Sequence, residues 1–210
     1  SNEDDARTRI SPNSTYKIYS ALIALDAGII TAKDSAMAWN GEACPFDSWN
    51  RDQNLNTAMT NSVNWYFMNL DRQSGLDSIK RELTALSYGN LDFSGGLSRF
   101  WLESSLKISP LEQVKLLAAL SGHTLPYSER DMETVKDALF LSSDGTSSLY
   151  GKTGTGTVDG KNTNGWFIGF IESENGSCSF AVHINGDDGA TGTKAGEIAL
   201  RILKEKQLYG

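Results

Sequence analysis

The sequence predicts an α/β fold in the broad sense: a small antiparallel sheet flanked by helices, a mostly helical lobe, and a site between them. Three observations lead to this class. Apolar residues recur at helical spacing in several segments of the first 140 residues. After Ser143-Asp144-Gly145 the pattern changes to that of strands. Asn175-Gly176 lies between two of these strands, and this dipeptide is a strong signal of a hairpin.

Start and stop signals define the expected helices. The clearest start is Ser109, an N-cap followed by Pro110 at the first helical position and by Glu112, which completes a capping box. Gly28 is a natural stop for the first helix. We expect helices at 14–27, 55–70 with a break at 62–64, 75–86, 109–120, 128–140 and 193–206, and strands at 149–158, 165–172 and 178–185.

Residues 1–13 and 31–55 show no sustained periodicity, so we expect both stretches to be irregular. Aromatic side chains bury a large apolar area when they pack in a core. We therefore expect Trp39, Phe46 and Trp49 to anchor the second stretch against the core.

Composition argues against several classes of function. The chain of 210 residues has a formal net charge of −7 and no basic cluster, so nucleic acid is not an expected partner. No run of 18 apolar residues and no signal peptide are present, so we expect no membrane span. His123 and His183 show no ligand spacing with the two cysteines, so we expect no metal site. Cys44 and Cys178 could pair or stay free.

Ser14 and Lys17 lie three apart at the start of an apolar run, 18–30. On a helix their hydroxyl and amine would share one face, as a nucleophile and its base do. Alone, the pattern also fits a capping serine and a solvated lysine. Lys17 could be a base only when uncharged, and moving its pKa from about 10.4 to about 7 costs roughly 4–5 kcal/mol, which requires burial or a cationic neighbour. Alternatively, carbon dioxide could add to the amine and give a carbamate base.

Ser62-Val63-Asn64 follows at the expected helix break. Ser62 could relay a proton to a leaving nitrogen, and Asn64 could bond the base or a substrate amide. Taken alone, the triplet is an ordinary polar break between helices.

Lys152-Thr153-Gly154-Thr155 lies on an expected strand. The Lys152 ammonium and the hydroxyls of Thr153 and Thr155 suit a substrate carboxylate. Gly154 would allow an acyl substrate to approach the backbone closely. The backbone N–H after Gly154, together with that of Ser14, could form an oxyanion hole. Alone, the stretch could be a surface turn.

Ser-x-x-Lys, Ser-x-Asn and Lys-Thr-Gly, in this order, form the signature set of serine β-lactamases and penicillin-binding proteins. The chain resembles the class D (OXA-type) β-lactamase family from about residue 10 to its end. The resemblance implies a β-lactamase/transpeptidase-like fold, a carbamate on Lys17 formed from carbon dioxide or bicarbonate, and a role for Trp101 in steadying that carbamate. Further stretches that carry it are Tyr88-Gly89-Asn90, Phe100-Trp101-Leu102-Glu103, Leu106-Lys107-Ile108-Ser109 and Gly165-Trp166-Phe167.

Within this family the chain is similar to the extracellular penicillin-sensing domain of BlaR/MecR-type signal transducers. The stretches behind this finer resemblance are Ser11-Pro12-Asn13-Ser14-Thr15-Tyr16-Lys17-Ile18-Tyr19, Trp49-Asn50-Arg51-Asp52-Gln53-Asn54-Leu55-Asn56 and Asn61-Ser62-Val63-Asn64-Trp65-Tyr66. Class D hydrolases typically have an apolar residue at the position of Asn64. A polar Asn64 beside Lys17 would favour loss of the carbamate after acylation, so that the acyl-enzyme persists.

The resemblance implies a sensor that β-lactams acylate once at Ser14 and that signals to a membrane-embedded partner at the extracellular face of the cytoplasmic membrane of a Gram-positive-type bacterium. The alternatives are a secreted class D β-lactamase that uses a carbamylated Lys17, and a peptidoglycan transpeptidase or carboxypeptidase. Val63 and the 153–155 stretch are expected to contact the substrate. Lys194 is expected to replace the arginine with which class D hydrolases hold the drug's carboxylate.

The resemblance also divides the chain into a lead-in, 1–13, and a penicillin-binding domain, 14–210. The family domain normally has several tens of residues before the first motif, and they supply two strands and an early helix. We therefore expect either a truncated lead-in, with three remaining strands that leave an exposed edge, or a sheet that is completed some other way, such as by another chain.

Overall fold

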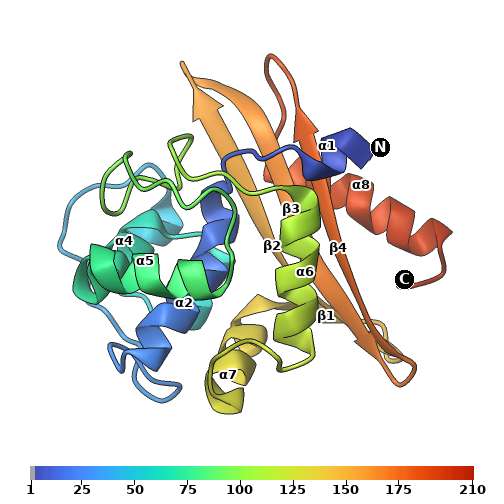
Figure 1. Cartoon of the computed structure of the whole chain (residues 1–210), viewed down its shortest axis with the longest axis horizontal. Coiled ribbons are helices and arrows are strands. Elements are labelled where there is room, and N and C mark those ends of the chain that lie inside the picture. Colours follow the sequence, from blue (N-terminus) through green and yellow to red (C-terminus); the bar gives the residue numbers. More distant parts are fainter. Residues whose placement is uncertain (1–2) are drawn as a thin grey trace.

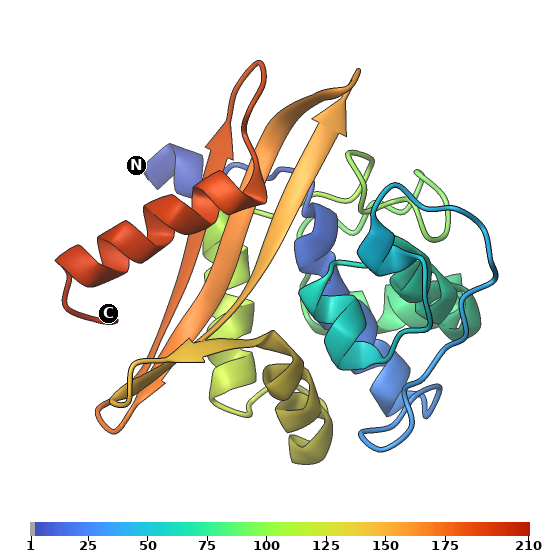
Figure 2. The ribbon, with the colours of Figure 1, turned by 180° about the vertical axis from the view of Figure 1, so that it is seen from behind.

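The computed structural model describes residues 3–210 and contains a four-stranded antiparallel sheet. Helix α8 (Gly192–Glu205) covers one face of this sheet, and α6 (Pro110–Ser121) lies on the opposite face together with the helical lobe (Figures 1 and 2). The strands are β1 (Phe140–Ser143), β2 (Ser147–Val158), β3 (Lys161–Ser173) and β4 (Gly176–Asn185), paired in that order.

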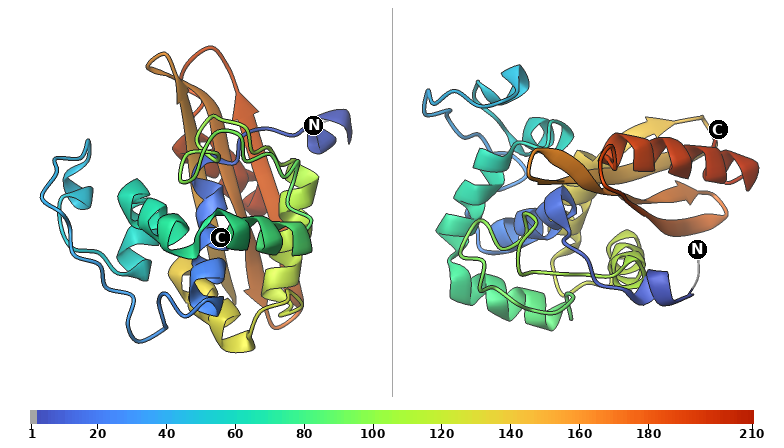
Figure 3. Two further views of the ribbon diagram at one scale, coloured as in Figure 1. Left: turned by 60° about the vertical axis from the view of Figure 1, so that its left-hand side comes forward. Right: turned by 90° about the horizontal axis from the view of Figure 1, so that it is seen from above.

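The helical lobe packs beside β2, and a view from above separates it from α8 by the thickness of the sheet (Figure 3). The remaining helices are α1 (Glu3–Arg7), α2 (Lys17–Asp26), α3 (Leu55–Thr60), α4 (Asn64–Ser74), α5 (Leu76–Ala85) and α7 (Glu129–Leu139). Two short 3₁₀ turns, η1 (Asn13–Tyr16) and η2 (Asp47–Trp49), complete the secondary structure of the described residues.

The fold class and most predicted elements are confirmed. The predicted cap at Ser109 is present, with the Ser109 and Glu112 side chains each accepting from the other residue's backbone N–H. The predicted break at 62–64 separates α3 from α4, and Ser62 lies in the left-handed region with φ +55°. The Asn175-Gly176 hairpin joins β3 to β4.

Two predictions about elements are wrong. The sheet has four strands and not three, because the chain turns extended at Phe140 and pairs Phe140 with Tyr150 of β2. Apolar Phe140 and Leu141 continued the helical spacing of α7, which hid this strand in the sequence. The lead-in is not wholly irregular, since α1 forms there and is supported by an ion pair between Arg7 and Glu3, 2.7 Å apart and four residues apart in sequence.

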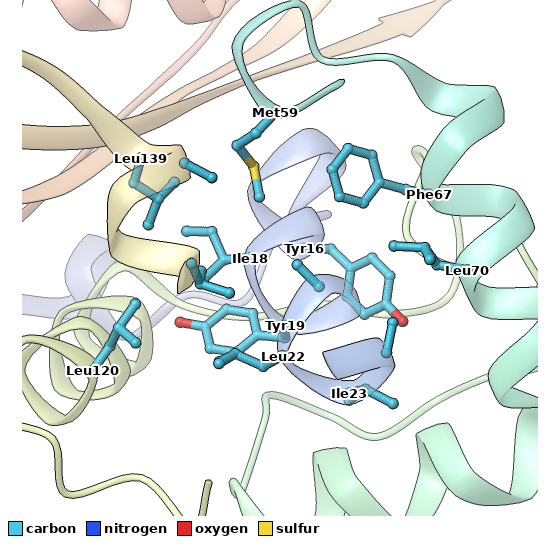
Figure 4. Packing of buried hydrophobic residues seen from close by; sticks show 14 of the residues in the cluster. Tyr16, Ile18, Tyr19, Leu22, Ile23, Met59, Phe67, Leu70, Leu120 and Leu139 are labelled. Atoms are coloured by element: carbon cyan, nitrogen blue, oxygen red, sulfur yellow. The ribbon is translucent and has the colours of Figure 1, made fainter. Parts of the chain in front are cut away.

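Helix α2 runs through the middle of the core. Every residue from Lys17 to Leu25 is buried, because α4, α5 and α7 all pack against this helix. Apolar side chains surround it on all sides, as Figure 4 shows for Ile18, Leu22 and their neighbours. A helix that is apolar all round must be buried, and its first turn therefore takes Lys17 into the core with it.

The loop between α2 and α3 is anchored less deeply than predicted. Trp49 is half-buried, packs against the core and donates its indole N–H to the Asn61 carbonyl at 2.9 Å. Trp39 is half-buried and donates to the Glu42 carbonyl. The prediction that Phe46 packs in the core is wrong, because its side chain is 58% exposed and contacts the Trp49 ring, with 5.1 Å between ring centroids.

Cys44 and Cys178 are both free thiols, which settles the alternative that the sequence left open. Within residues 3–210, no helix is both long enough and apolar enough to cross a membrane.

The cap at Ser109 leads to a prediction about stability. Ser109→Ala should lower the free energy of unfolding by about 1 kcal/mol, because the Glu112 N–H then loses its acceptor. Urea unfolding followed by circular dichroism measures this. Thr134→Ala is the matched control, since the Thr134 hydroxyl donates to Arg130 O inside α7; its effect should stay within about 0.5 kcal/mol. Equal losses in both variants would contradict the prediction.

Candidate active site

A cleft of about 590 Å³ opens between the helical lobe and β2. Its walls come from segments that are far apart in the sequence: η1, the α3–α4 junction, the loop around η2, the Leu102-Glu103 loop and β2. The lining residues are Asn13, Ser14, Phe46, Ser48, Trp49, Asn61, Ser62, Asn64, Leu102, Glu103, Thr153, Thr155, Thr157 and Asn162.

Ser14 and Lys17 meet as the sequence predicted. Ser14 lies in the 3₁₀ turn η1, and Lys17 opens α2 directly after it. The Lys17 Nζ atom lies 2.9 Å from Ser14 Oγ. As an ammonium, Lys17 donates to this oxygen. As an amine, it can accept the serine proton across the same distance, which is the geometry of a nucleophile and its base.

Acceptor atoms surround the Lys17 nitrogen. Besides Ser14, it donates to the Ser62 carbonyl at 2.6 Å, to Ser62 Oγ at 3.1 Å and to Asn64 Oδ1 at 2.7 Å. The rings of Phe67 and Trp101 complete the surroundings, with centroids 5.5 and 5.4 Å from Nζ. Such surroundings suit a protonated or neutral amine. The oxygens of the carbamate that the family resemblance implied would need hydrogen-bond donors, and the hydroxyls of Ser14 and Ser62 beside Nζ can donate.

Burial changes the acidity of two lysines. The pKa of Lys17 is held well below its ordinary value, first by burial and then by the nearby charge of Lys152, while Asp71 opposes the shift. Burial lowers the pKa of Lys152 to about 7. The Lys152 Nζ atom donates to Ser62 Oγ at 3.0 Å, so the Ser62 hydroxyl lies between the two amines. A proton can therefore move between Lys17 and Lys152 through Ser62.

The predicted strand stretch forms one wall of the cleft. Thr153 and Thr155 line it, and the Thr155 hydroxyl also accepts from the Gly192 N–H at 2.9 Å. Gly154 lies close to the turn that carries Ser14. A Cβ there would lie 3.0 Å from the Pro12 carbonyl and 3.4 Å from the Ser14 nitrogen. The glycine therefore lets β2 pack against the turn that carries the nucleophile, and it is not among the residues that line the cleft.

Two other predicted substrate contacts are not brought to the cleft. Val63 is fully buried at the start of α4 and does not line the cavity. Lys194 lies in the first turn of α8, where its backbone N–H bonds the Thr191 hydroxyl, and its side chain is not part of the cavity wall.

The sequence interpretation missed a cluster centred on Glu103. The Glu103 carboxylate accepts from Asn13 Nδ2 at 2.7 Å and from Asn164 Nδ2 at 2.6 Å. The Asn13 side chain in turn accepts from the Glu103 N–H at 3.2 Å. Asn13 has φ +49° and directly precedes Ser14, so these bonds hold a sparsely populated backbone conformation beside the nucleophile. The cluster ties η1, the Leu102-Glu103 loop and β3 together.

Comparison with known proteins agrees with this geometry. The family model for the penicillin-binding protein transpeptidase domain matches residues 2–204. The chain belongs to this family.

Three relatives are similar to this penicillin-binding domain in sequence or in structure. The regulatory protein BlaR1 of Bacillus licheniformis is 45% identical over 99% of the chain. The solved structure of the C-terminal domain of the Bacillus licheniformis BlaR penicillin receptor superposes with a TM-score of 0.95, covering 100% of this chain and 85% of that one. The methicillin resistance mecR1 protein of Staphylococcus aureus is 44% identical over 99% of the chain. A class D β-lactamase from Bacillus subtilis is 40% identical, with a TM-score of 0.94 over 100% of this chain and 86% of that one.

These matches confirm the predicted resemblance to BlaR/MecR-type domains and to class D β-lactamases. The chain spans 34% of the length of the BlaR1 relative and 35% of the mecR1 relative.

The Glu103 cluster gives a prediction for this penicillin-binding domain. Glu103→Ala should slow the covalent labelling of Ser14 by benzylpenicillin about tenfold or more, because Asn13 loses its acceptor and the nucleophile turn shifts. Intact-protein mass spectrometry over time gives the rate. Glu197→Ala, which removes an exposed carboxylate on α8, is the control and should label at the wild-type rate. Equal rates for both variants would show that the cluster does not position Ser14.

The lowered pKa of Lys17 gives a prediction about pH. The amine form of Lys17 survives to a lower pH than that of an ordinary lysine, so the labelling rate should reach its plateau at a lower pH than an ordinary lysine base would give, and fall as the pH drops through the lowered pKa. Labelling rates between about pH 5 and about pH 10 test this. A rate that keeps rising up to about pH 10 would mean that the base has an ordinary lysine pKa.

Proposed function

We propose that this domain is a β-lactam sensor of the BlaR/MecR type: a β-lactam acylates Ser14, and the adduct persists as the signal. The observation that carries the proposal is the contact of 2.7 Å between Lys17 Nζ and Asn64 Oδ1. Among the described residues, Lys17 is the only group placed to act as a base on Ser14, and this contact puts a polar acceptor beside it. A hydrolase, in contrast, needs surroundings that keep its base active after the ester has formed.

The acylation step follows from the described contacts. Ser14 Oγ attacks the β-lactam carbonyl carbon, an ester bond forms, and the ring C–N bond breaks. The serine proton passes to the Lys17 amine at 2.9 Å and then through the Ser62 hydroxyl to the ring nitrogen. Lys152 contacts the same hydroxyl at 3.0 Å, and its positive charge favours the developing anion.

Persistence of the adduct requires that water is not activated against the ester. Glu103 is the only carboxylate among the described residues that line the cleft, and its Oε1 atom accepts from both Asn13 and Asn164, which fix the carboxylate in place. Once the ring nitrogen has taken the serine proton, Lys17 is again an amine, and the acceptors around it favour the uptake of a further proton from solvent. An ammonium cannot act as a base, and the ester therefore outlives the acylation step.

The partner and location are part of the same proposal. The BlaR1 and mecR1 relatives are about three times as long as this chain, which leaves room in those proteins for a further signalling part. We expect this domain to bind penicillins and cephalosporins at the extracellular face of the cytoplasmic membrane and to signal to a membrane-embedded remainder.

A second candidate function is hydrolysis by a class D β-lactamase. The superposition with the Bacillus subtilis enzyme at a TM-score of 0.94 favours it. The two functions share the acylation step and differ in whether the ester is hydrolysed.

Intact-protein mass spectrometry after mixing with benzylpenicillin distinguishes them. We expect a one-to-one adduct that forms fast and lasts for hours, and Ser14→Ala should abolish it. An adduct that vanishes while hydrolysed product accumulates would make the protein a β-lactamase. Labelling that persists in Ser14→Ala would overturn the assignment of the nucleophile.

Replacing Asn64 tests the contact between Lys17 Nζ and Asn64 Oδ1, on which the proposal rests. Asn64→Val removes the contact at Oδ1 and should shorten the lifetime of the adduct about tenfold, because protonated Lys17 loses a stabilising partner. The decay of the adduct mass measures this lifetime. Asn61→Ala is the control, since Asn61 also lines the cleft and its amide donates to Thr57 O. Equal lifetimes for wild type and Asn64→Val would contradict the role given to Asn64.

A further inference from the structure

A buried carboxylate lies in the core beside the Lys17 site. Asp71, on α4, is 1% exposed. Its Oδ1 accepts from the Tyr16 hydroxyl at 3.2 Å and from Ser20 Oγ at 2.8 Å, and its Oδ2 accepts from the Trp101 indole N–H at 3.0 Å. Removing a carboxylate from water costs free energy even when three donors bond to it, so we asked what this carboxylate does for the neighbouring site.

Trp101 connects this carboxylate to the active-site lysine. The face of its ring lies toward Lys17, with Nζ 5.4 Å from the ring centroid, while its N–H is bonded to Asp71. An indole has a single donor. In this arrangement Trp101 therefore has no N–H to offer to an anion at Lys17.

The charge of Asp71 acts on Lys17 directly. Burial raises the pKa of Asp71 to about 6, while the three donors oppose the rise, so the carboxylate is largely ionised at neutral pH. Its charge stabilises Lys17 as an ammonium against the effect of burial. The same charge would repel a second anion at Lys17, and repulsion is strong where water is excluded.

We propose that Asp71 is a positioning residue that weakens carbamate formation on Lys17, by occupying the Trp101 N–H and by placing a negative charge in the same part of the core. The reaction it opposes is addition of carbon dioxide to the neutral amine, in which an N–C bond forms, one C=O π bond of carbon dioxide opens to give the carboxylate, and one amine proton passes to solvent. This inference rests on the proposed sensor function, because a scarce or short-lived carbamate leaves the deacylating water without an oxygen base.

The test is a titration of the Lys17 carbamate with ¹³C-labelled bicarbonate, followed by the carbamate carbon signal in NMR. Asp71→Asn removes the charge and keeps the size of the side chain, so half-occupancy should need about tenfold less bicarbonate than in the wild type. The lifetime of the benzylpenicillin adduct should shorten in parallel.

Ser20→Ala is the matched control. It removes one donor to Oδ1 and keeps the bond to Trp101, and at a pH well above the Asp71 pKa of about 6 it also leaves the charge of Asp71, so the bicarbonate titration at that pH should match that of the wild type. A merely structural role for the cluster would disturb both variants alike. If Asp71→Asn does not fold, Asp71→Ser makes the same change of charge and retains a hydroxyl for the buried donors.

The outcomes separate this inference from the proposed function. A carbamate titration that is unchanged in the neutral variant overturns the role of Asp71, whatever the lifetime of the wild-type adduct. Rapid turnover of benzylpenicillin by the wild type overturns the sensor proposal, whatever the bicarbonate titration shows. A tighter carbamate in Asp71→Asn, unchanged in Ser20→Ala, supports the inference.

Discussion

The burial of the Lys17 side chain is the constraint on which the rest of the site depends. Helix α2 is mostly apolar and buried from Lys17 to Leu25, and packing it into the core takes the lysine at its first turn out of water. A buried ammonium is costly, so the fold both lowers the pKa of this group and surrounds it with acceptors. That compromise supplies an amine close enough to Ser14 to take its proton.

The charge on Lys17 also separates the two candidate functions. Both a sensor and a hydrolase need an amine that accepts the serine proton, but only a hydrolase needs a base again after the ester has formed. Asn64 and the Ser62 carbonyl on one side, and Asp71 behind Trp101 on the other, all favour the cationic form over an anionic one. Whether the ester on Ser14 is hydrolysed therefore depends on the polarity of the surroundings of Lys17, and not on the nucleophile itself.

The site is assembled where the two halves of the fold meet. The nucleophile belongs to the helical lobe, whereas Lys152 belongs to the sheet, and Ser62 Oγ is bonded by both lysines. The cluster of Asn13, Glu103 and Asn164 holds the two halves at this position from the other side of Ser14. Small errors in how the lobe sits on the sheet would separate groups that now lie within hydrogen-bond distance.

The sequence by itself determined what depends on neighbours in the chain: the cap at Ser109, the hairpin before β4, the break before α4, and the pairing of Ser14 with Lys17 across one helical turn. Its motif order also indicated which distant stretches would meet. Only the tertiary structure showed that the charge of Asp71 faces the active-site core and that Lys194 lies away from the cleft. The partners of a buried charge and the walls of a cleft come from segments far apart in sequence, and no local periodicity specifies them.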